Sequence, residues 1–388
     1  MNRSPILWLL LLLWSGCLRA ESPLRTGAEQ TERYLPLLEG KRVGILTNHT
    51  GTVGRTHLVD TLLSLGIDIR VVFAPEHGFR GDADAGESIG NYKDRKTGID
   101  VLSVYGSNKR PQDSVMRKLD VLLFDIQDVG LRYYTYLSSM HYLMEACADN
   151  GKELIVLDRP NPNGFYVDGP VLEARHRSFV GMHPIPVVHG MTLGELARMI
   201  DGEGWLGDGK HCSLRVVPCA NYTHRTRYEL PVKPSPNLPN MRAVYLYPSL
   251  CFFEGTPVSL GRGTDFPFQA YGHPRMSGDF AFTPRSNAGA KNPPLKDRLC
   301  KGRDLRENPS NERIWQAGVD LGYVIEAYRM LDMGEKFFTP MFDKLTGASY
   351  VREMILRGED ADAIRERWRN DVNEFLKLRK PYLLYEEE

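Results

Sequence analysis

The sequence lacks the signatures of several large classes of protein. No G-x-G-x-x-G follows its first apolar stretch and no G-x-x-x-x-G-K-[ST] occurs, so neither a dinucleotide site nor a P-loop is indicated. It contains no C-x-x-C pair, which argues against a thiolate zinc site. Basic and acidic residues number 49 each, so no charge excess calls for a nucleic acid or an anionic membrane surface. We therefore predict no cofactor and no nucleic-acid partner.

Long apolar runs are confined to the first twenty residues. Arg3 precedes an apolar stretch, 6–14, and small residues follow, which is the layout of a secretory signal at 1–20 and too short for an ordinary membrane span. Two processing routes stay open: cleavage after Ala20, or lipidation of Cys17 in W-S-G-C, which resembles a bacterial lipoprotein box. We expect an exported protein, either periplasmic or membrane-anchored by lipid, with no membrane-spanning segment after signal removal.

Cysteine is scarce in the rest of the chain. The five that follow the signal are Cys147, Cys212, Cys219, Cys251 and Cys300. An odd number leaves at least one thiol unpaired within the monomer. Cys212 and Cys219 flank a predicted strand, which holds them too far apart for a disulfide. We predict that all five are structural or buried, with no catalytic role.

Two hydrophobic patterns alternate over the first half of the chain. Apolar strand-like runs occur at 42–48, 67–78, 120–128, 152–164 and 185–190, and helical spacing occurs at 56–66, 135–151 and 191–200. Thr192 and Glu195 are spaced as a capping box. Such alternation predicts an α/β domain with a mainly parallel sheet, which we place at 21–243.

Beyond about residue 235 the composition changes to loops rich in proline, glycine and aromatic residues. Two amphipathic helices are predicted there, at 315–331 and 361–378. In the second helix the predicted apolar face is Ile364, Trp368, Val372 and Phe375. We therefore predict a smaller α+β domain at 244–388, packed on the first.

Each predicted strand ends in polar side chains. In open parallel sheets, ligands bind at the carboxyl ends of the strands. The side chains expected at this edge are Thr47, Asn48 and His49; Glu76, His77 and Arg80; Asp125, Gln127 and Asp128; Asp158, Arg159 and Asn161; and His189. A solvated loop explains any single group, but five such groups together favour a polar ligand.

The stretch A-P-E-H-G-F-R-G-D-A-D-A-G-E is rich in carboxylates. Glycosidic bonds are commonly cut by two carboxyl groups, of which one donates a proton to the leaving oxygen. Glu76 fits the donor best because it follows an apolar strand, where desolvation favours a protonated carboxyl. Glu87 or Asp125 could be the second carboxyl group. The alternative is a metal site: His77 with Asp82 and Asp84 could hold a divalent ion, although the order is not that of a calcium loop.

The stretch F-D-I-Q-D-V-G-L-R-Y-Y-T-Y-L places Arg132 and Tyr133 at the start of a predicted helix, where backbone amides favour anions. An arginine beside a tyrosine suits a sugar that carries a carboxylate, although a capped helix with core tyrosines explains the pattern as well. Arg159 and Arg262 occupy tight Gly/Pro loops and are further candidates for binding such a ligand.

Five long motifs then resemble those of bacterial exo-β-N-acetylmuramidases of the NamZ (YbbC-like) type, glycoside hydrolase family 171. They are A-P-E-H-G-F-R-G, F-D-I-Q-D-V-G-L-R-Y-Y-T-Y, L-D-R-P-N-P-N-G, I-P-V-V-H-G-M-T-L-G-E-L-A and E-G-T-P-V-S-L-G-R-G-T, and the similarity runs from about Arg42 to the end of the chain. The resemblance implies a Rossmann-like domain and a smaller C-terminal domain with the active cleft between them. It implies release of terminal N-acetylmuramic acid from the non-reducing ends of peptidoglycan fragments during cell-wall turnover, with Glu76 as catalytic glutamate.

Several points stay open after this resemblance. Glu87 and Asp125 both remain candidates for the second catalytic group, and Arg132 or Arg262 could bind the lactyl carboxylate of muramic acid. The segment 284–314 matches no motif, and we interpret it as a variable surface insertion. The alternatives are a periplasmic protein that binds amino sugars or muropeptides without chemistry, and a metal-dependent murein amidase or esterase.

Overall fold

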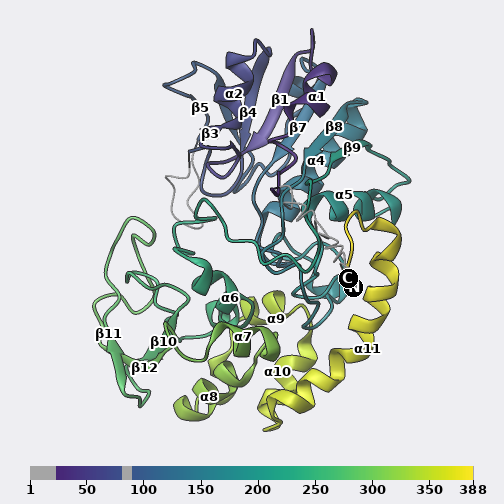
Figure 1. Cartoon of the computed structure of the whole chain (residues 1–388). Helices are drawn as coiled ribbons and strands as arrows, with labels where there is room; N and C mark the ends of the chain where they lie inside the picture. Colours follow the sequence, from purple (N-terminus) through teal and green to yellow (C-terminus); the bar gives the residue numbers. More distant parts are fainter. Residues whose placement is uncertain (1–22, 81–89, 388) are drawn as a thin grey trace, which may run out of the picture.

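The computed structural model describes residues 23–80 and 90–387 (Figure 1). The predicted signal with Cys17 lies outside the described residues, as do Asp82, Asp84 and Glu87. No helix within the described ranges is long and apolar enough to cross a membrane.

A buried sheet of seven strands forms the centre of the first domain, in the order β5-β6-β4-β1-β7-β8-β9. Its strands are β1 (Val43–Thr47), β4 (Ile69–Ala74), β5 (Tyr92–Lys93), β6 (Asp100–Ser103), β7 (Val121–Asp125), β8 (Glu153–Leu157) and β9 (Ser213–Val217). All neighbours are parallel except the edge pair β5 and β6. Every residue of β1 and β7 is buried, as expected for parallel strands that helices cover on both faces.

Alternate residues of the strands enter two separate cores. Val121 and Leu123 of β7 pack with α2, whereas Leu122 and Phe124 pack with α4 and α5. The elements that surround the sheet are α1 (Thr31–Tyr34), η1 (Leu35–Leu37), the β2–β3 hairpin (Thr52–Val53, Thr56–His57), α2 (Leu58–Ser64), α3 (Asp113–Met116), α4 (Tyr136–Asn150), η2 (Ala174–His176) and α5 (Leu193–Gly202). The predicted Rossmann-like α/β class and the capping box of Thr192 and Glu195 are confirmed.

A small antiparallel sheet and a group of helices make the second domain. Its elements are α6 (Met241–Leu250), η3 (Cys251–Gly255), β10 (Ala270–His273), β11 (Phe280–Phe282), β12 (Cys300–Asp304), α7 (Asn311–Ala317), α8 (Gly322–Leu331), η4 (Gly334–Phe337), α9 (Pro340–Thr346), α10 (Ser349–Leu356), α11 (Ala361–Arg379) and η5 (Lys380–Tyr382). The predicted apolar face of α11 is buried as expected. From α11 the chain returns to the first domain beside α5 (Figure 1).

Two predicted elements are wrong. The helix predicted at 315–331 is broken, because Gly318 adopts a φ of 63° where an added Cβ would lie 2.3 Å from a carboxylate oxygen of Asp168. The strand predicted at 185–190 is absent from the sheet: Val188 makes only isolated bridges, to Leu131 and Asp168. His189 therefore does not follow a sheet strand.

All five cysteines in the described ranges are buried, as predicted, and each is a free thiol. Burial raises the pKa of the Cys219, Cys251 and Cys147 thiols well above its usual range, so these groups are protonated at neutral pH. They pack as small apolar side chains.

A buried arginine between β7 and α4 ties the two domains together. The Arg132 Nη1 donates to the carbonyls of Pro170 and Ile185 at 2.7 and 2.8 Å, and its Nη2 donates to those of Leu345 and Thr346 at 2.9 and 2.8 Å. Burial lowers the pKa of Arg132 to about 10, so the side chain stays charged at neutral pH. One guanidinium therefore fixes loops of the first domain against the end of α9.

Replacing this arginine should loosen the junction between the domains. Arg132→Met keeps a long side chain but leaves four buried carbonyls without their donor, so we expect the free energy of unfolding to fall by about 3 kcal/mol or more. Urea unfolding followed by tryptophan fluorescence measures the change. The exposed Arg95→Met is the control, expected to stay within about 0.5 kcal/mol of the wild type. Equal stability of the two variants would contradict this role of Arg132.

Candidate active site

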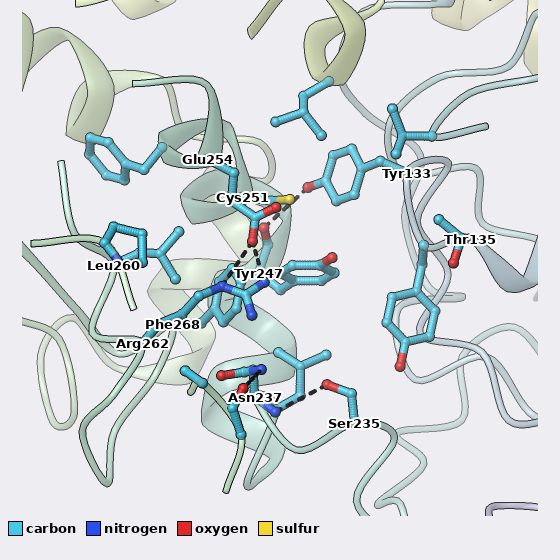
Figure 2. Close-up of a pocket in the computed structure, with 18 of the residues that line it drawn as sticks. Tyr133, Thr135, Ser235, Asn237, Tyr247, Cys251, Glu254, Leu260, Arg262 and Phe268 are labelled. Carbon is cyan, nitrogen blue, oxygen red and sulfur yellow. Dashed lines mark hydrogen bonds and ion pairs between the residues drawn. The ribbon is translucent and has the colours of Figure 1, made fainter. Parts of the chain in front are cut away.

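A cavity of about 740 Å³ lies between the two domains. The first domain contributes the loop after β4, the start of α4 and the segment that leads into α6, and the second contributes η3 and the loops around β10. Figure 2 shows Thr135 and Tyr133 on one side of this cavity and Arg262, Leu260 and Phe268 on the other. A ligand in the cavity would therefore contact both domains, as the predicted cleft requires.

The loop after β4 carries Glu76 into this cavity. The strand ends at Ala74, and a turn closed by the Gly78 amide on the Pro75 carbonyl, at 3.0 Å, follows at once. His77 adopts a φ of 68°, which is uncommon for a residue with a side chain and recurs at functional sites. This sharp turn makes Glu76 and His77 both line the cavity.

Two hydroxyl groups position the Glu76 carboxyl. Tyr105 donates to Oε1 at 2.9 Å and Thr135 donates to Oε2 at 2.6 Å. Burial, together with the neighbouring Glu76, raises the pKa of the Tyr105 hydroxyl, so it keeps its proton at neutral pH. Both oxygens of Glu76 therefore have a defined orientation at the edge of the cavity.

A second carboxylate, Glu254 of η3, lines the cavity from the other domain. Its Oε1 forms an ion pair with Arg262, whose Nε lies at 3.2 Å and whose Nη2 is also a donor (Figure 2). The Arg262 guanidinium lies 5.2 Å above the Phe268 ring. Burial by itself would lower the pKa of Arg262, but the Glu254 carboxylate outweighs it and raises that pKa. The ion pair is partly exposed, and both of its residues line the cavity.

Aromatic side chains from both domains also line the cavity. Tyr133 and Tyr247 meet edge to face with ring centroids 5.4 Å apart, and Phe268 packs against Tyr247 in the same way at 4.8 Å. The Tyr133 hydroxyl lies 2.9 Å from the Pro248 carbonyl and the Tyr134 hydroxyl 2.9 Å from that of Pro234. The tyrosines are thus fixed, and their nearly buried rings make an apolar part of the cavity lining.

Only some of the predicted site residues reach this cavity. Glu76, His77, Tyr133 and Arg262 line it. The others take part in contacts elsewhere: Asn48, Arg80, Asp125, Gln127, Arg132, Asp158, Arg159, Asn161 and His189. Glu87 lies outside the described residues and stays a prediction.

Asp125 is the clearest correction, because the structure uses it as a counter-ion. Arg159 donates to both of its oxygens, at 2.6 and 2.9 Å, and also to the carbonyl of Thr52. Asp125 is fully buried and does not line the cavity. Because β7 and β8 are neighbours, the two side chains at their carboxyl ends neutralise each other inside the domain, and neither lines the cavity.

Asp158 and His189 likewise serve the packing of the first domain. Asp158 accepts from Thr192 at 2.6 Å and from Tyr385 at 2.5 Å, and burial raises its pKa to about 6. His189 accepts from the Met191 amide, and burial lowers its pKa to about 3. Neither group is among the residues that line the cavity.

The remaining predicted residues close turns at the same edge. The Asn48 Oδ1 accepts from the amide and hydroxyl of Thr50, and the Gln127 amide donates to the Pro160 carbonyl. Asn161 donates to the Met191 carbonyl at 2.8 Å, and Arg80 pairs with Asp94 at 2.8 Å. Arg132 belongs to the domain junction described above, so its predicted binding of a carboxylate is wrong.

Several cavity residues escaped prediction. Glu254 stands eight residues before Arg262 in E-G-T-P-V-S-L-G-R-G-T, a motif that drew attention only for its arginine. Tyr105 and Thr135 carried no signal of their own. The segment 284–314, which we interpreted as a variable surface insertion, contributes residues 289–294 to the lining of the cavity.

The described residues include no group of three or more histidine, cysteine, aspartate or glutamate side chains that could hold a metal ion. The predicted alternative, His77 with Asp82 and Asp84, lies partly outside them.

Comparison with known proteins gives matches over nearly the whole chain. The family description "Exo-beta-N-acetylmuramidase NamZ, N-terminal" matches residues 43–242, and "Exo-beta-N-acetylmuramidase NamZ, C-terminal" matches residues 245–385. The peptidoglycan beta-N-acetylmuramidase NamZ of Bacillus subtilis (strain 168) is 36% identical over 379 residues, which cover 91% of this chain and 89% of that protein.

Two crystal structures of DUF1343 family proteins from Bacteroides fragilis NCTC 9343 share the fold. One is 54% identical with a TM-score of 0.88, and the match covers 95% of this chain and 100% of the other. The second is 29% identical with a TM-score of 0.78, over 94% of this chain and 99% of the other.

Proposed function

The chain belongs to the exo-beta-N-acetylmuramidase NamZ family, and we propose on this basis that it is a glycosidase that releases terminal N-acetylmuramic acid from the non-reducing ends of peptidoglycan fragments. The observation that carries the proposal is the pair of carboxyl groups, Glu76 and Glu254, which line one cavity from different domains. Glycoside hydrolysis needs two such groups around the scissile bond.

Glu76 is the general acid in this proposal. It gives its proton to the glycosidic oxygen as the bond from that oxygen to C1 of the muramic acid breaks. Its partners Tyr105 and Thr135 carry hydroxyl groups, which can donate to a carboxylate and accept from a carboxylic acid. Glu76 therefore keeps its orientation in both protonation states.

Glu254 is the second carboxyl group, and it replaces Asp125 in that role. Two routes fit its position. In one route it attacks C1 directly or activates a water for that attack; in the other the acetamido oxygen of the substrate attacks C1 while Glu254 accepts from the acetamido N–H. The ion pair with Arg262 sets the position of this carboxylate in either route.

Arg262 also supplies the recognition of the lactyl group. Muramic acid differs from glucosamine by a lactyl ether whose carboxylate needs a cation, and arginine binds carboxylates well. The Nη1 of Arg262 makes no hydrogen bond within the described part of the chain, whereas Nε and Nη2 hold Glu254. This third nitrogen is the donor that we assign to the lactyl carboxylate.

The role of Glu76 can be tested by comparing two leaving groups. 4-Nitrophenolate departs with little help from an acid, whereas a sugar alcohol needs a proton. We therefore expect Glu76→Gln to slow hydrolysis of β-N-acetylmuraminyl-1,4-N-acetylglucosamine by about 10²- to 10⁴-fold and hydrolysis of 4-nitrophenyl β-N-acetylmuraminide much less. Glu254→Gln is the matched variant, and it should slow both substrates to a similar degree.

The same assay separates the proposed activity from its alternatives. The wild type should hydrolyse 4-nitrophenyl β-N-acetylmuraminide but not the corresponding glucosaminide, and a chelator should leave the rate unchanged. Binding of N-acetylmuramic acid without turnover would indicate a binding protein, and loss of activity with chelator would indicate a metal-dependent enzyme. If Glu76→Gln slows hydrolysis of the disaccharide and of the 4-nitrophenyl substrate by the same factor, Glu76 is not the general acid.

The role of Arg262 requires a comparison of substrates with and without the lactyl group. We expect Arg262→Ala to lower kcat/KM for 4-nitrophenyl β-N-acetylmuraminide by about tenfold or more beyond its effect on the corresponding glucosaminide. The reason is that only the muraminide has a lactyl carboxylate, so only this substrate loses a charged hydrogen bond to Arg262. Arg262→Lys keeps the charge and should recover part of the preference. If kcat/KM falls by the same factor for the muraminide and the glucosaminide, Arg262 acts only through Glu254.

We also propose that the protein is exported and reaches peptidoglycan outside the inner membrane, on the strength of the signal-like residues 1–20. Mass spectrometry of the chain after expression in a Gram-negative bacterium should find an N-terminus at Glu21, or a lipid on Cys17 that Cys17→Ser removes. An unprocessed chain in the cytosol would contradict export.

A further inference from the structure

A short segment between β11 and β12 forms part of the cavity wall on the side of the second domain. Residues 289–294, which include Lys291, Asn292, Pro293 and Pro294, all line the cavity. They lie in the stretch that no sequence motif covers. Six consecutive lining residues from one loop make a boundary of the ligand space, and we refer to them as the 289–294 wall.

Hydrogen bonds from both domains fix the 289–294 wall and its approach. The Asn237 side-chain amide donates to the Gly289 carbonyl at 2.8 Å, and the Arg285 amide donates to the Gly263 carbonyl at 2.8 Å. Asn287 closes a turn with Ala290, through reciprocal backbone bonds of 3.1 and 3.2 Å. The segment is therefore held in place before any ligand enters.

Close packing adds to this restraint. Gly263, beside Arg262, has a φ of 79°, and an added Cβ would lie 2.6 Å from the Pro293 ring. Pro293 is buried, and two successive prolines restrict the backbone of the wall. The wall thus packs directly against the loop that carries Arg262.

The chemistry of the acid sets the direction of the sugar. Glu76 must reach the glycosidic oxygen, so C1 of the released sugar lies toward Glu76 and the leaving sugar lies on that side. In a pyranose, O4 lies across the ring from C1. Thr135, which holds Glu76, and Arg262 lie on opposite sides of the cavity (Figure 2). Arg262 is assigned to the lactyl carboxylate on C3, the carbon next to C4, so O4 points toward the side of Arg262 and the 289–294 wall.

We propose that the 289–294 wall ends the path of the glycan at O4 of the bound muramic acid and so restricts hydrolysis to chain ends. A further sugar on O4 would need the volume that Pro293 and its neighbours occupy. This inference rests on the proposed function and adds the element that enforces it. It also explains why the loop between β11 and β12 is fixed by Asn237 and Gly263.

The test compares two chromogenic substrates. One is 4-nitrophenyl β-N-acetylmuraminide, with a free O4, and the other carries an additional β-linked N-acetylglucosamine on O4. The wall variant is Asn292→Gly/Pro293→Gly/Pro294→Gly, and the milder Asn292→Gly/Pro294→Gly retains the packing of Pro293 on Gly263. The control is Lys296→Gly/Asp297→Gly/Arg298→Gly, three exposed residues of the same loop that do not line the cavity.

The measured quantity is the ratio of kcat/KM for the two substrates. Wild type and control should release nitrophenol almost only from the substrate with free O4, and the wall variant should shift this ratio toward the substituted substrate by about tenfold or more. The milder variant should shift it in the same direction.

Two results would overturn the inference: wild-type hydrolysis of both substrates at similar rates, or an unchanged ratio in both wall variants. If the triple variant does not fold, as judged by circular dichroism, the milder variant and the wild-type ratio still decide. If wild type releases nitrophenol from neither substrate, the proposed function itself fails, and this outcome is distinct from an altered or unaltered ratio.

Discussion

The cavity depends on one buried guanidinium that holds two domains in register. Arg132 donates to four carbonyls, two from loops of the α/β domain and two from the end of α9. A guanidinium is planar and its donors diverge at fixed angles, so it fixes the relative positions of all four acceptors. Carbonyl dipoles, and no carboxylate of the described residues, stabilise its charge. Glu76 and Glu254 come from different domains, so their separation is set by this junction.

The polar side chains at the carboxyl edge of the sheet fall into two groups: some stabilise the first domain, and others line the cavity. Asp125 pairs with Arg159 and Asp158 with Thr192, so these groups are satisfied within the first domain. The loop after β4 differs because its turn, with His77 in the left-handed region, carries Glu76 out to the cavity. Backbone conformation, more than residue type, therefore decides which carboxylate is available to a ligand.

The sequence predicted the α/β class, the order of its main elements and the place of Glu76 at the cavity, because hydrophobic periodicity and local motifs carry that information. It did not predict which polar residues would pair with one another, since the partnership of Asp125 and Arg159 depends on strand order. Glu254 was missed for a related reason: a single glutamate in an aromatic loop has no local pattern. Arg132 was expected to bind a ligand, and only the packing of α9 over it shows that both of its terminal nitrogens already donate to carbonyls.

The return of the chain end to the first domain has a consequence for synthesis. Tyr385 donates to the buried Asp158, and the Leu384 amide donates to Glu195, the capping residue of α5. Until these residues leave the ribosome, Asp158 and Glu195 each lack one of their hydrogen-bond donors. The α/β domain, although translated first, completes its polar interior last. A chain that is truncated before Leu384 therefore has its packing defect in the α/β domain, which is translated first, and cellular quality control can detect the defect there.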